Sequence, residues 1–159
     1  MKRTPQGDIA LSIKTHGCAI FPVSTGSGYF AYTIGLSDHG SAEVIMYARN
    51  LETLMRMMSN VVGHVLIGKM SFEPDIPLDD FSNVTVVFKH VPEPKARERA
   101  AQAFYWFESK GVVPNFLQLV LPDRSSCFPW EPGFDSEFMA YQEDLSSTIL
   151  IQTFEFQED

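Results

Sequence analysis

Apolar side chains recur at helical spacing in three stretches of the chain. The first covers residues 7–15 and ends before Gly17, a residue typical of helix ends. The second covers residues 51–66 and follows Asn50, whose side chain suits the position that caps a helix N-terminus. The third lies within residues 92–111 and opens with prolines, which are tolerated there because the first N–H groups of a helix are unpaired. This periodicity predicts three helices.

β-branched and aromatic residues dominate several segments between and after these helices, as is typical of strands. These segments are residues 18–23, 29–36, 43–48, 84–91, 116–121 and 148–156. The Gly- and Ser-rich residues 24–28 join the first two segments as a hairpin loop. The pattern predicts a single α+β domain with about three helices. Its sheet is mostly antiparallel, has about five to six strands and is covered on one face, and the helical crossovers allow some parallel pairing.

Composition places the chain among globular proteins. Of its 159 residues, 45% are hydrophobic and 20% are charged, which is enough apolar material for one core. No stretch approaches the roughly 20 apolar residues that a membrane-spanning helix needs, and the N-terminal segment lacks the apolar centre of a signal peptide. The two cysteines, Cys18 and Cys127, form no CxxC pair. We therefore expect a cytoplasmic protein with reduced thiols and no membrane contact.

The net charge of -8 is confined to the C-terminal part of the chain. Residues 1–130 hold 12 basic and 12 acidic side chains, whereas the segment from Glu131 onward holds eight acidic side chains and no Lys or Arg. A segment of one sign repels phosphate backbones and attracts a basic protein surface. Direct nucleic-acid binding is therefore disfavoured, and two interpretations stay open: the charge maintains solubility, or it faces a basic partner.

Four blocks in a fixed order stand out from ordinary core patterning. They are His16-Gly17, the segment FAYTIGL at residues 30–36, the segment LQLVLPD at residues 117–123 and the loop FPWEPG at residues 128–133, with Gln142 downstream. In these blocks the chain resembles the bacterial family catalogued as domain of unknown function 4262 (DUF4262), over roughly residues 16 to 142. The resemblance implies a family and not a chemistry.

Two positions depart from the usual pattern of that family. Cys18 stands where tryptophan is usual, and Ser41-Ala42-Glu43 stands where His-Pro-Glu is common, so a histidine of the relatives is lost here or replaced by His39. Residues 1–145 are expected to form the family-like α+β domain. Residues 146–159 are expected to form an acidic, strand-like extension that packs on or extends the same domain.

Five residues in or near these blocks are candidates for a ligand pocket. They are His16, Tyr32, Gln118, Asp123 and Trp130. A polar side chain between apolar neighbours, such as Gln118, must find hydrogen-bond partners if it is buried. Two interpretations remain open: these side chains fix the geometry of loops, or they line a small-molecule-binding or catalytic pocket beneath the Trp130 ring.

The sequence carries no clear catalytic centre. A cysteine nucleophile needs a neighbouring base, and Cys18 lies two residues from His16, but no nucleophile-elbow motif is present. The four histidines are scattered and form no HxH, HxxxH or HExxH pair, so we expect neither a metal site nor a cofactor. A binding protein is therefore favoured over an enzyme.

The confined acidic charge favours an interaction protein as the first hypothesis. Such a protein binds and modulates a basic protein partner, in the manner of immunity proteins or phage-encoded inhibitors of host defence. Charge supplies rate and orientation, and buried anchors supply affinity. The candidate contact residues are Glu137, Phe138, Tyr141, Glu143, Asp144, Phe154, Glu155 and Phe156. The small-molecule pocket is the alternative, and a homodimer formed through the last strand is a third hypothesis.

Overall fold

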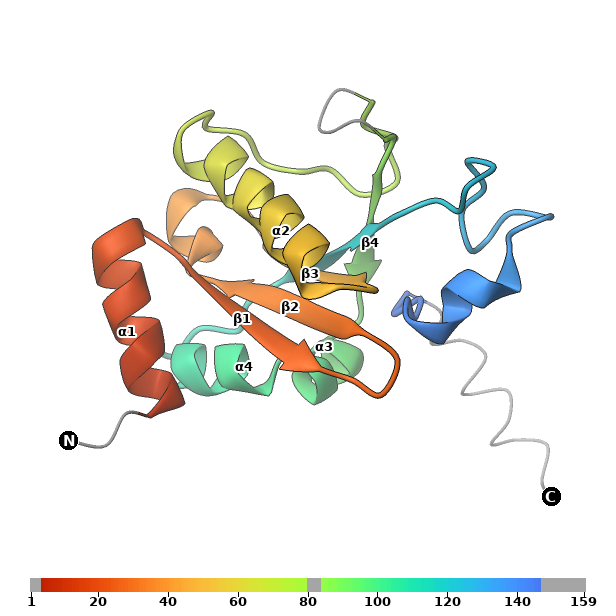
Figure 1. Cartoon of the computed structure of the whole chain (residues 1–159). Coiled ribbons are helices and arrows are strands. Elements are labelled where there is room, and N and C mark those ends of the chain that lie inside the picture. Colours follow the sequence, from red (N-terminus) through yellow and green to blue (C-terminus); the bar gives the residue numbers. More distant parts are fainter. Residues whose placement is uncertain (1–3, 80–83, 147–159) are drawn as a thin grey trace, which may run out of the picture.

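A five-stranded sheet lies at the centre of the computed structural model, which describes residues 4–79 and 84–146 (Figure 1). Its strands are β1 (Ala19–Ser24), β2 (Tyr29–Ile34), β3 (Glu43–Ala48), β4 (Val87–Val91) and β5 (Phe116–Val120). They follow the order β1-β2-β3-β5-β4. The β3–β5 pair is parallel and the other three pairs are antiparallel, so the sheet is mixed and mostly antiparallel. The strand predicted at residues 148–156 lies outside the described residues.

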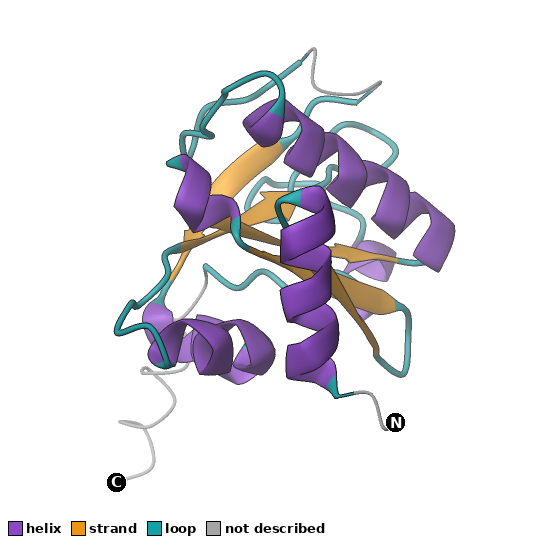
Figure 2. Ribbon diagram, turned by 90° about the vertical axis from the view of Figure 1, so that its left-hand side faces the viewer, coloured by secondary structure: helices purple, strands orange, loops and turns teal. Residues whose placement is uncertain are grey.

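Helices cover both faces of this sheet (Figures 1 and 2). The α-helices are α1 (Pro5–His16), α2 (Leu51–Leu66), α3 (Glu93–Arg99) and α4 (Ala101–Glu108), and the short 3-10 helices are η1 (Leu36–His39) and η2 (Ser136–Ala140). In Figure 1, α2 lies above the sheet, α3 and α4 lie below it, and α1 stands beside β1. None of the helices in the described part of the chain is long and apolar enough to cross a membrane.

The expectation of a sheet covered on one face was wrong. Every residue of β3 and β5 is buried, as is typical of strands that pack against neighbours on both faces. Residues such as Met46 and Leu119 join the core beneath α2, whereas Ile45 and Phe116 join the core beneath α3 and α4. Alternate side chains of the central strands therefore build two separate cores.

The single helix predicted within residues 92–111 is two helices. The chain bends at Ala100, whose backbone angles of φ -112 and ψ 49 are not helical. A new helix start leaves N–H groups without helical partners, and one of them, the N–H of Gln102, donates to the hydroxyl oxygen of Tyr32 at 3.1 Å. Ala100 and Tyr32 are both buried, so the bend is part of the packing against the sheet. Periodicity alone does not reveal such a bend.

Candidate functional site

A cavity of about 380 Å³ opens where β3 and β5 end. Because these strands are parallel, their carboxyl ends lie at the same edge of the sheet, which is where open sheets commonly bind ligands. After β3 the chain continues into α2, which packs on one face of the sheet. After β5 it leads to Leu145, which is buried in the core on the opposite face of the sheet. The cavity is lined by Ala48, Arg49, Asn50, Thr53, Val84, Leu121, Pro122, Asp123, Arg124, Phe138 and Tyr141.

Two arginines and a tyrosine meet in this cavity. The guanidinium carbon of Arg49 lies 5.2 Å from the centre of the Tyr141 ring. Burial raises the pKa of Tyr141, and the charges of Arg49 and Arg124 lower it by less, so the hydroxyl stays protonated at neutral pH. Among residues 4–79 and 84–146, neither arginine forms an ion pair. The cavity therefore carries two arginines that no carboxylate of the described residues pairs with.

Asp123 also lines the cavity, but its carboxylate is occupied by the backbone. Its Oδ1 accepts the N–H groups of Ser125 and Cys127, both at 2.9 Å, and its Oδ2 accepts the N–H of Asp135 at 2.8 Å. The bond from Cys127 is the largest of the effects that together lower the pKa of Asp123. A carboxylate held in this way is a poor base, so its role is to fix the loop that carries Arg124.

The wall that carries Tyr141 is fastened to β5 by two buried glutamines. The side-chain amide of Gln142 accepts the N–H of Leu121 at 3.0 Å and donates to the carbonyl of the same residue at 2.9 Å. The amide of Gln118 donates to the carbonyl of Glu143 at 2.6 Å and accepts the N–H of Leu145 at 2.9 Å. Both glutamine side chains are fully buried. These bonds place Tyr141 opposite the ends of β3 and β5.

The five residues predicted for a pocket do not line one common cavity. Of the five, the cavity described above includes only Asp123. Tyr32 and Gln118 bind backbone groups inside the fold. Trp130 is 41% exposed and stacks on Phe128 with 5.2 Å between the ring centres. His16 lines a separate cavity of about 320 Å³ together with Ser12, Cys18, Ile20, Ser59 and Val62.

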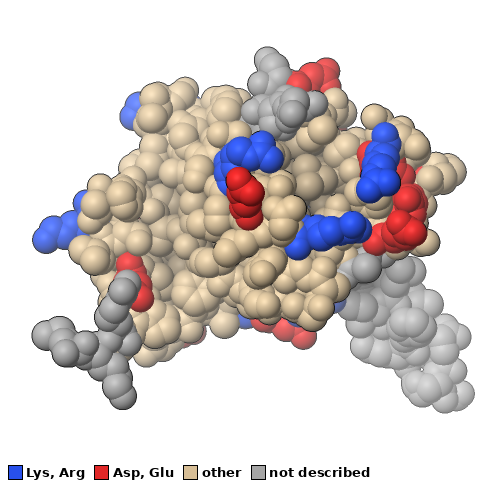
Figure 3. All heavy atoms as spheres, viewed as in Figure 1, with Lys and Arg blue, Asp and Glu red and all other residues tan. Residues whose placement is uncertain are grey.

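The acidic residues predicted to face a partner are partly used inside the molecule. Glu143 accepts hydrogen bonds from Arg99 at 2.8 and 3.0 Å and from the Tyr47 hydroxyl at 3.1 Å, and Lys95 lies 3.6 Å away. Asp144 accepts the N–H and the hydroxyl of Ser146. On the face in Figure 3, acidic and basic groups lie next to one another instead of forming a patch of one sign.

The other members of that set lie in three places. Glu137 is exposed. Phe138 and Tyr141 face the cavity, with 5.7 Å between their ring centres. Phe154, Glu155 and Phe156 lie outside the described residues. Phe138 and Tyr141, the aromatic members of the set in the described part, therefore line a cavity. Glu137 is the exposed acidic member of the set in the described part.

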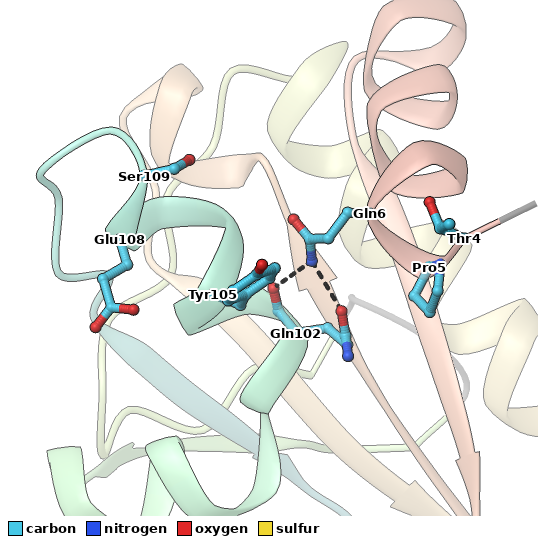
Figure 4. Close-up of a pocket in the computed structure, with 7 residues that line it drawn as sticks. All are labelled: Thr4, Pro5, Gln6, Gln102, Tyr105, Glu108 and Ser109. Atoms are coloured by element: carbon cyan, nitrogen blue, oxygen red, sulfur yellow. Dashed lines mark hydrogen bonds between the residues drawn. The ribbon is translucent and has the colours of Figure 1, made fainter.

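A larger cavity of about 830 Å³ lies between α1 and α4 (Figure 4). Gln6 crosses it, and its amide nitrogen donates to both oxygens of Gln102, at 2.8 Å for the side chain and 3.2 Å for the backbone. Its lining includes the exposed Tyr105 and the carboxylate of Glu108, but no basic residue in the described part of the chain. Because its amides already bind each other, it is the weaker candidate for a ligand site.

Thiol and metal chemistry find little support in the described residues. Burial, with the charge of Glu43 as the next cause, raises the pKa of Cys18 far above its usual value, so the thiol stays neutral. Burial also raises the pKa of Cys127. Within residues 4–79 and 84–146, no three His, Cys, Asp or Glu side chains gather where they could hold a metal ion.

Sequence reasoning missed Arg49 and Arg124. Both follow the end of a strand. The strand predicted at residues 43–48 has the bounds of β3, and the one predicted at residues 116–121 is one residue longer than β5. The pattern allowed some parallel pairing, but it did not show that these two strands are parallel neighbours. A search for basic residues just after the ends of strands joined by helical crossovers would have singled out both arginines.

Comparison with known proteins gives one match. A family model described as "Domain of unknown function (DUF4262)" matches residues 12–135. No curated protein matches the chain, and no solved structure matches it. The matched region includes β1 to β5 and the loop that Asp123 holds, and it ends before Phe138 and Tyr141.

Proposed function

The chain belongs to the DUF4262 family, and we propose that it is a binding protein for a small anionic molecule, held in the cavity at the carboxyl ends of β3 and β5. The observation that carries this proposal is the meeting of Arg49 and Arg124 at Tyr141, with no ion pair to either arginine in the described part of the chain. An anion supplies the counter-charge that the described residues do not provide.

The side chains available in the cavity are mainly hydrogen-bond donors. Arg49 and Arg124 each offer several N–H groups, and Tyr141 offers a protonated hydroxyl. Asn50 uses its side-chain oxygen to accept the N–H of Thr53 at 2.8 Å, which leaves its NH₂ group as a further side-chain donor in the lining. Asp123 is occupied by backbone N–H groups. A ligand rich in acceptors complements this set.

The same side chains of the cavity favour binding without catalysis. A general base works best with a pKa near the working pH, and the pKa of Asp123 is shifted the other way. The pKa of Tyr141 is raised, so its hydroxyl is a donor and not a nucleophile at neutral pH. The lining of the cavity contains no histidine, cysteine or lysine among the described residues. The proposal therefore names a ligand and no reaction.

The test is ligand-induced thermal stabilisation of the full chain at fixed ionic strength. We expect a set of small carboxylates and phosphate esters to contain stabilising ligands, whereas neutral analogues do not stabilise. Arg49→Ala or Arg124→Ala removes charge-assisted hydrogen bonds worth roughly 1.5 kcal/mol or more, so each raises the Kd about tenfold. Arg56→Ala, an exposed arginine of α2 outside the cavity, is the matched control. Equal stabilisation of all three variants would refute the site.

Docking to a basic protein partner stays a prediction, and the structure changes how it is tested. Glu143→Lys would place a lysine against Arg99 and Lys95, so lost binding by that variant could reflect damage to the fold. Glu137 is exposed and is the better position for charge reversal. We expect Glu137→Lys, and a chain ending at Ser146, to weaken capture of a basic partner and to reduce the salt dependence of that capture. Unchanged capture by both chains would exclude electrostatic docking.

A further inference from the structure

We infer that the anion accepted at the carboxyl ends of β3 and β5 is an organic phosphate monoester in its doubly charged form. The inference rests on the proposed function and specifies its ligand. It follows from three properties of the cavity: the separate origins of its donors, its two arginines, and the apolar wall beside them.

The donors come from three separate elements of the chain. Arg49 follows β3, Arg124 lies in the loop after β5, and Tyr141 follows η2. A planar carboxylate is satisfied by one guanidinium that meets both of its oxygens in a single plane. A phosphoryl group presents three oxygens in different directions, so it can accept from three groups that approach from different walls. The arrangement favours a tetrahedral group over a planar one.

The two guanidinium groups of the cavity suit a dianion. Arg49 and Arg124 contribute two positive charges, and the described part of the chain offers neither of them a paired carboxylate. The negatively charged Asp123 also lines the cavity, but both of its oxygens accept from backbone N–H groups, so both guanidinium groups stay available to a ligand. A phosphate monoester carries close to two negative charges above its second pKa, near 6, whereas a sulfate ester or a carboxylate carries one. The phosphate ester therefore neutralises both arginines.

The cavity is larger than a phosphate group alone requires. Its volume is about 380 Å³, against roughly 30 Å³ for a water molecule in the liquid. The remaining wall is built by Ala48, Leu121, Pro122 and Phe138, which offer apolar surface beside the arginines. Such a wall suits an organic group attached to the phosphate. Free phosphate fills only part of the site and should bind more weakly than an ester.

Four probes separate a phosphate ester from other anions: phenyl phosphate, phenyl sulfate, benzoate and inorganic phosphate. Isothermal titration of the full chain at constant ionic strength is expected to give phenyl phosphate a Kd at pH 7.5 at least about tenfold lower than that of the other three probes. At pH 5 the ester is mostly a monoanion, so its Kd should approach that of phenyl sulfate. The titratable groups of the lining other than arginine are Asp123 and Tyr141. Their pKa values are shifted away from this pH range, and phenyl sulfate controls for any change in the protein.

Two arginine variants and one control variant test which residues give the preference for the phosphate ester. Arg49→Gln and Arg124→Gln, checked for an unchanged urea midpoint, should each remove most of the preference for phenyl phosphate over phenyl sulfate, and Arg56→Gln should leave it intact. Tighter binding of benzoate or phenyl sulfate than of phenyl phosphate at pH 7.5 would overturn the phosphate inference and leave an anion site in place. Binding of none of the four probes would overturn both the inference and the proposed function.

Discussion

At the scale of single residues, the most heavily bonded side chain in the described part of the chain is Glu43, which is fully buried. Its carboxylate accepts five hydrogen bonds: from the Thr33 hydroxyl at 2.7 Å, from the N–H groups of Gly35, Leu36 and Ser37 at 2.9 to 3.1 Å, and from the Ser37 hydroxyl at 2.7 Å. Glu43 therefore fixes the turn from β2 into η1. Burial raises the pKa of this carboxyl, and the five donors act in the opposite direction.

Glu43→Gln tests whether this carboxylate is charged. An amide cannot accept on both sides, so Gly35 and Ser37, which donate to Oε2, would face an NH₂ group instead. Hydrogen bonds to a buried charge are among the strongest, and we expect a loss of about 3 kcal/mol in the free energy of unfolding, measured with urea at pH 7. Glu73→Gln, in an exposed loop, is the control and should change it by less than about 0.5 kcal/mol. A near-neutral Glu43→Gln would mean that the carboxyl is protonated in the fold.

Residue-scale reasoning could predict that a buried Gln118 would be bonded but not what it would bind. The rule that buried polar groups are paired depends only on the apolar neighbours of Gln118 in the sequence. Its partners, the carbonyl of Glu143 and the N–H of Leu145, lie 25 and 27 positions away. The same holds for Glu43, which gave no local signal because its donors lie six to ten positions earlier, at the end of β2 and in the turn after it.

At the scale of elements, the sequence predicted helices and strands that depend on neighbouring residues. It missed features that depend on contacts between distant residues. Helix α2 was placed correctly because its cap is local: Asn50 accepts the N–H of Thr53 at 2.8 Å. Strand β3 was placed at its observed bounds for the same kind of reason. The break at Ala100 depends on Tyr32, which lies far away in the sequence. Coverage of both sheet faces depends on where helices pack, which periodicity does not specify.

The segment after β5 has η2 as its regular element, and its irregular parts nevertheless have fixed contacts. Phe128 packs with Val87 of β4 and Val120 of β5. Gln142 then binds the backbone of Leu121, and Leu145 is buried in the core beneath α3 and α4. These contacts explain why a stretch that looks like loop and acidic tail in the sequence supplies one wall of the cavity. The wall of the candidate site that carries Phe138 and Tyr141 therefore could not be predicted before the tertiary fold was known.

At the scale of the whole molecule, Glu143 of the acidic C-terminal part of the chain pairs with basic residues of α3. Arg99 binds Glu143 through two nitrogens, and the ion pair joins positions that are far apart in the chain. The sequence correctly located the excess of negative charge, but charge counted along the chain does not show which groups neutralise each other. Part of the charge assigned to a partner surface is therefore used to hold the fold together.

This internal ion pair predicts how stability depends on pH. Desolvation raises the pKa of Glu143, but the hydrogen bonds and charge of Arg99, with help from Tyr47 and Lys95, lower it by more, so the net pKa lies below the usual value. A carboxyl that binds protons less tightly in the folded state stabilises the fold above its unfolded pKa, near 4.3. That contribution is lost as pH falls through the lower, folded pKa.

The expected measurement is the difference in unfolding free energy between wild type and Glu143→Gln. Glu143 is partly exposed, so solvent weakens the pair and the difference at pH 7 should be roughly 1 kcal/mol. It should stay constant down to about pH 5 and shrink towards pH 3, because protonated Glu143 no longer attracts Arg99. Glu137→Gln, at an exposed position, should show little difference at any pH. A Glu143 difference that stays the same from pH 7 to pH 3 would mean that the hydrogen bonds, and not the charge, hold the C-terminal segment against α3.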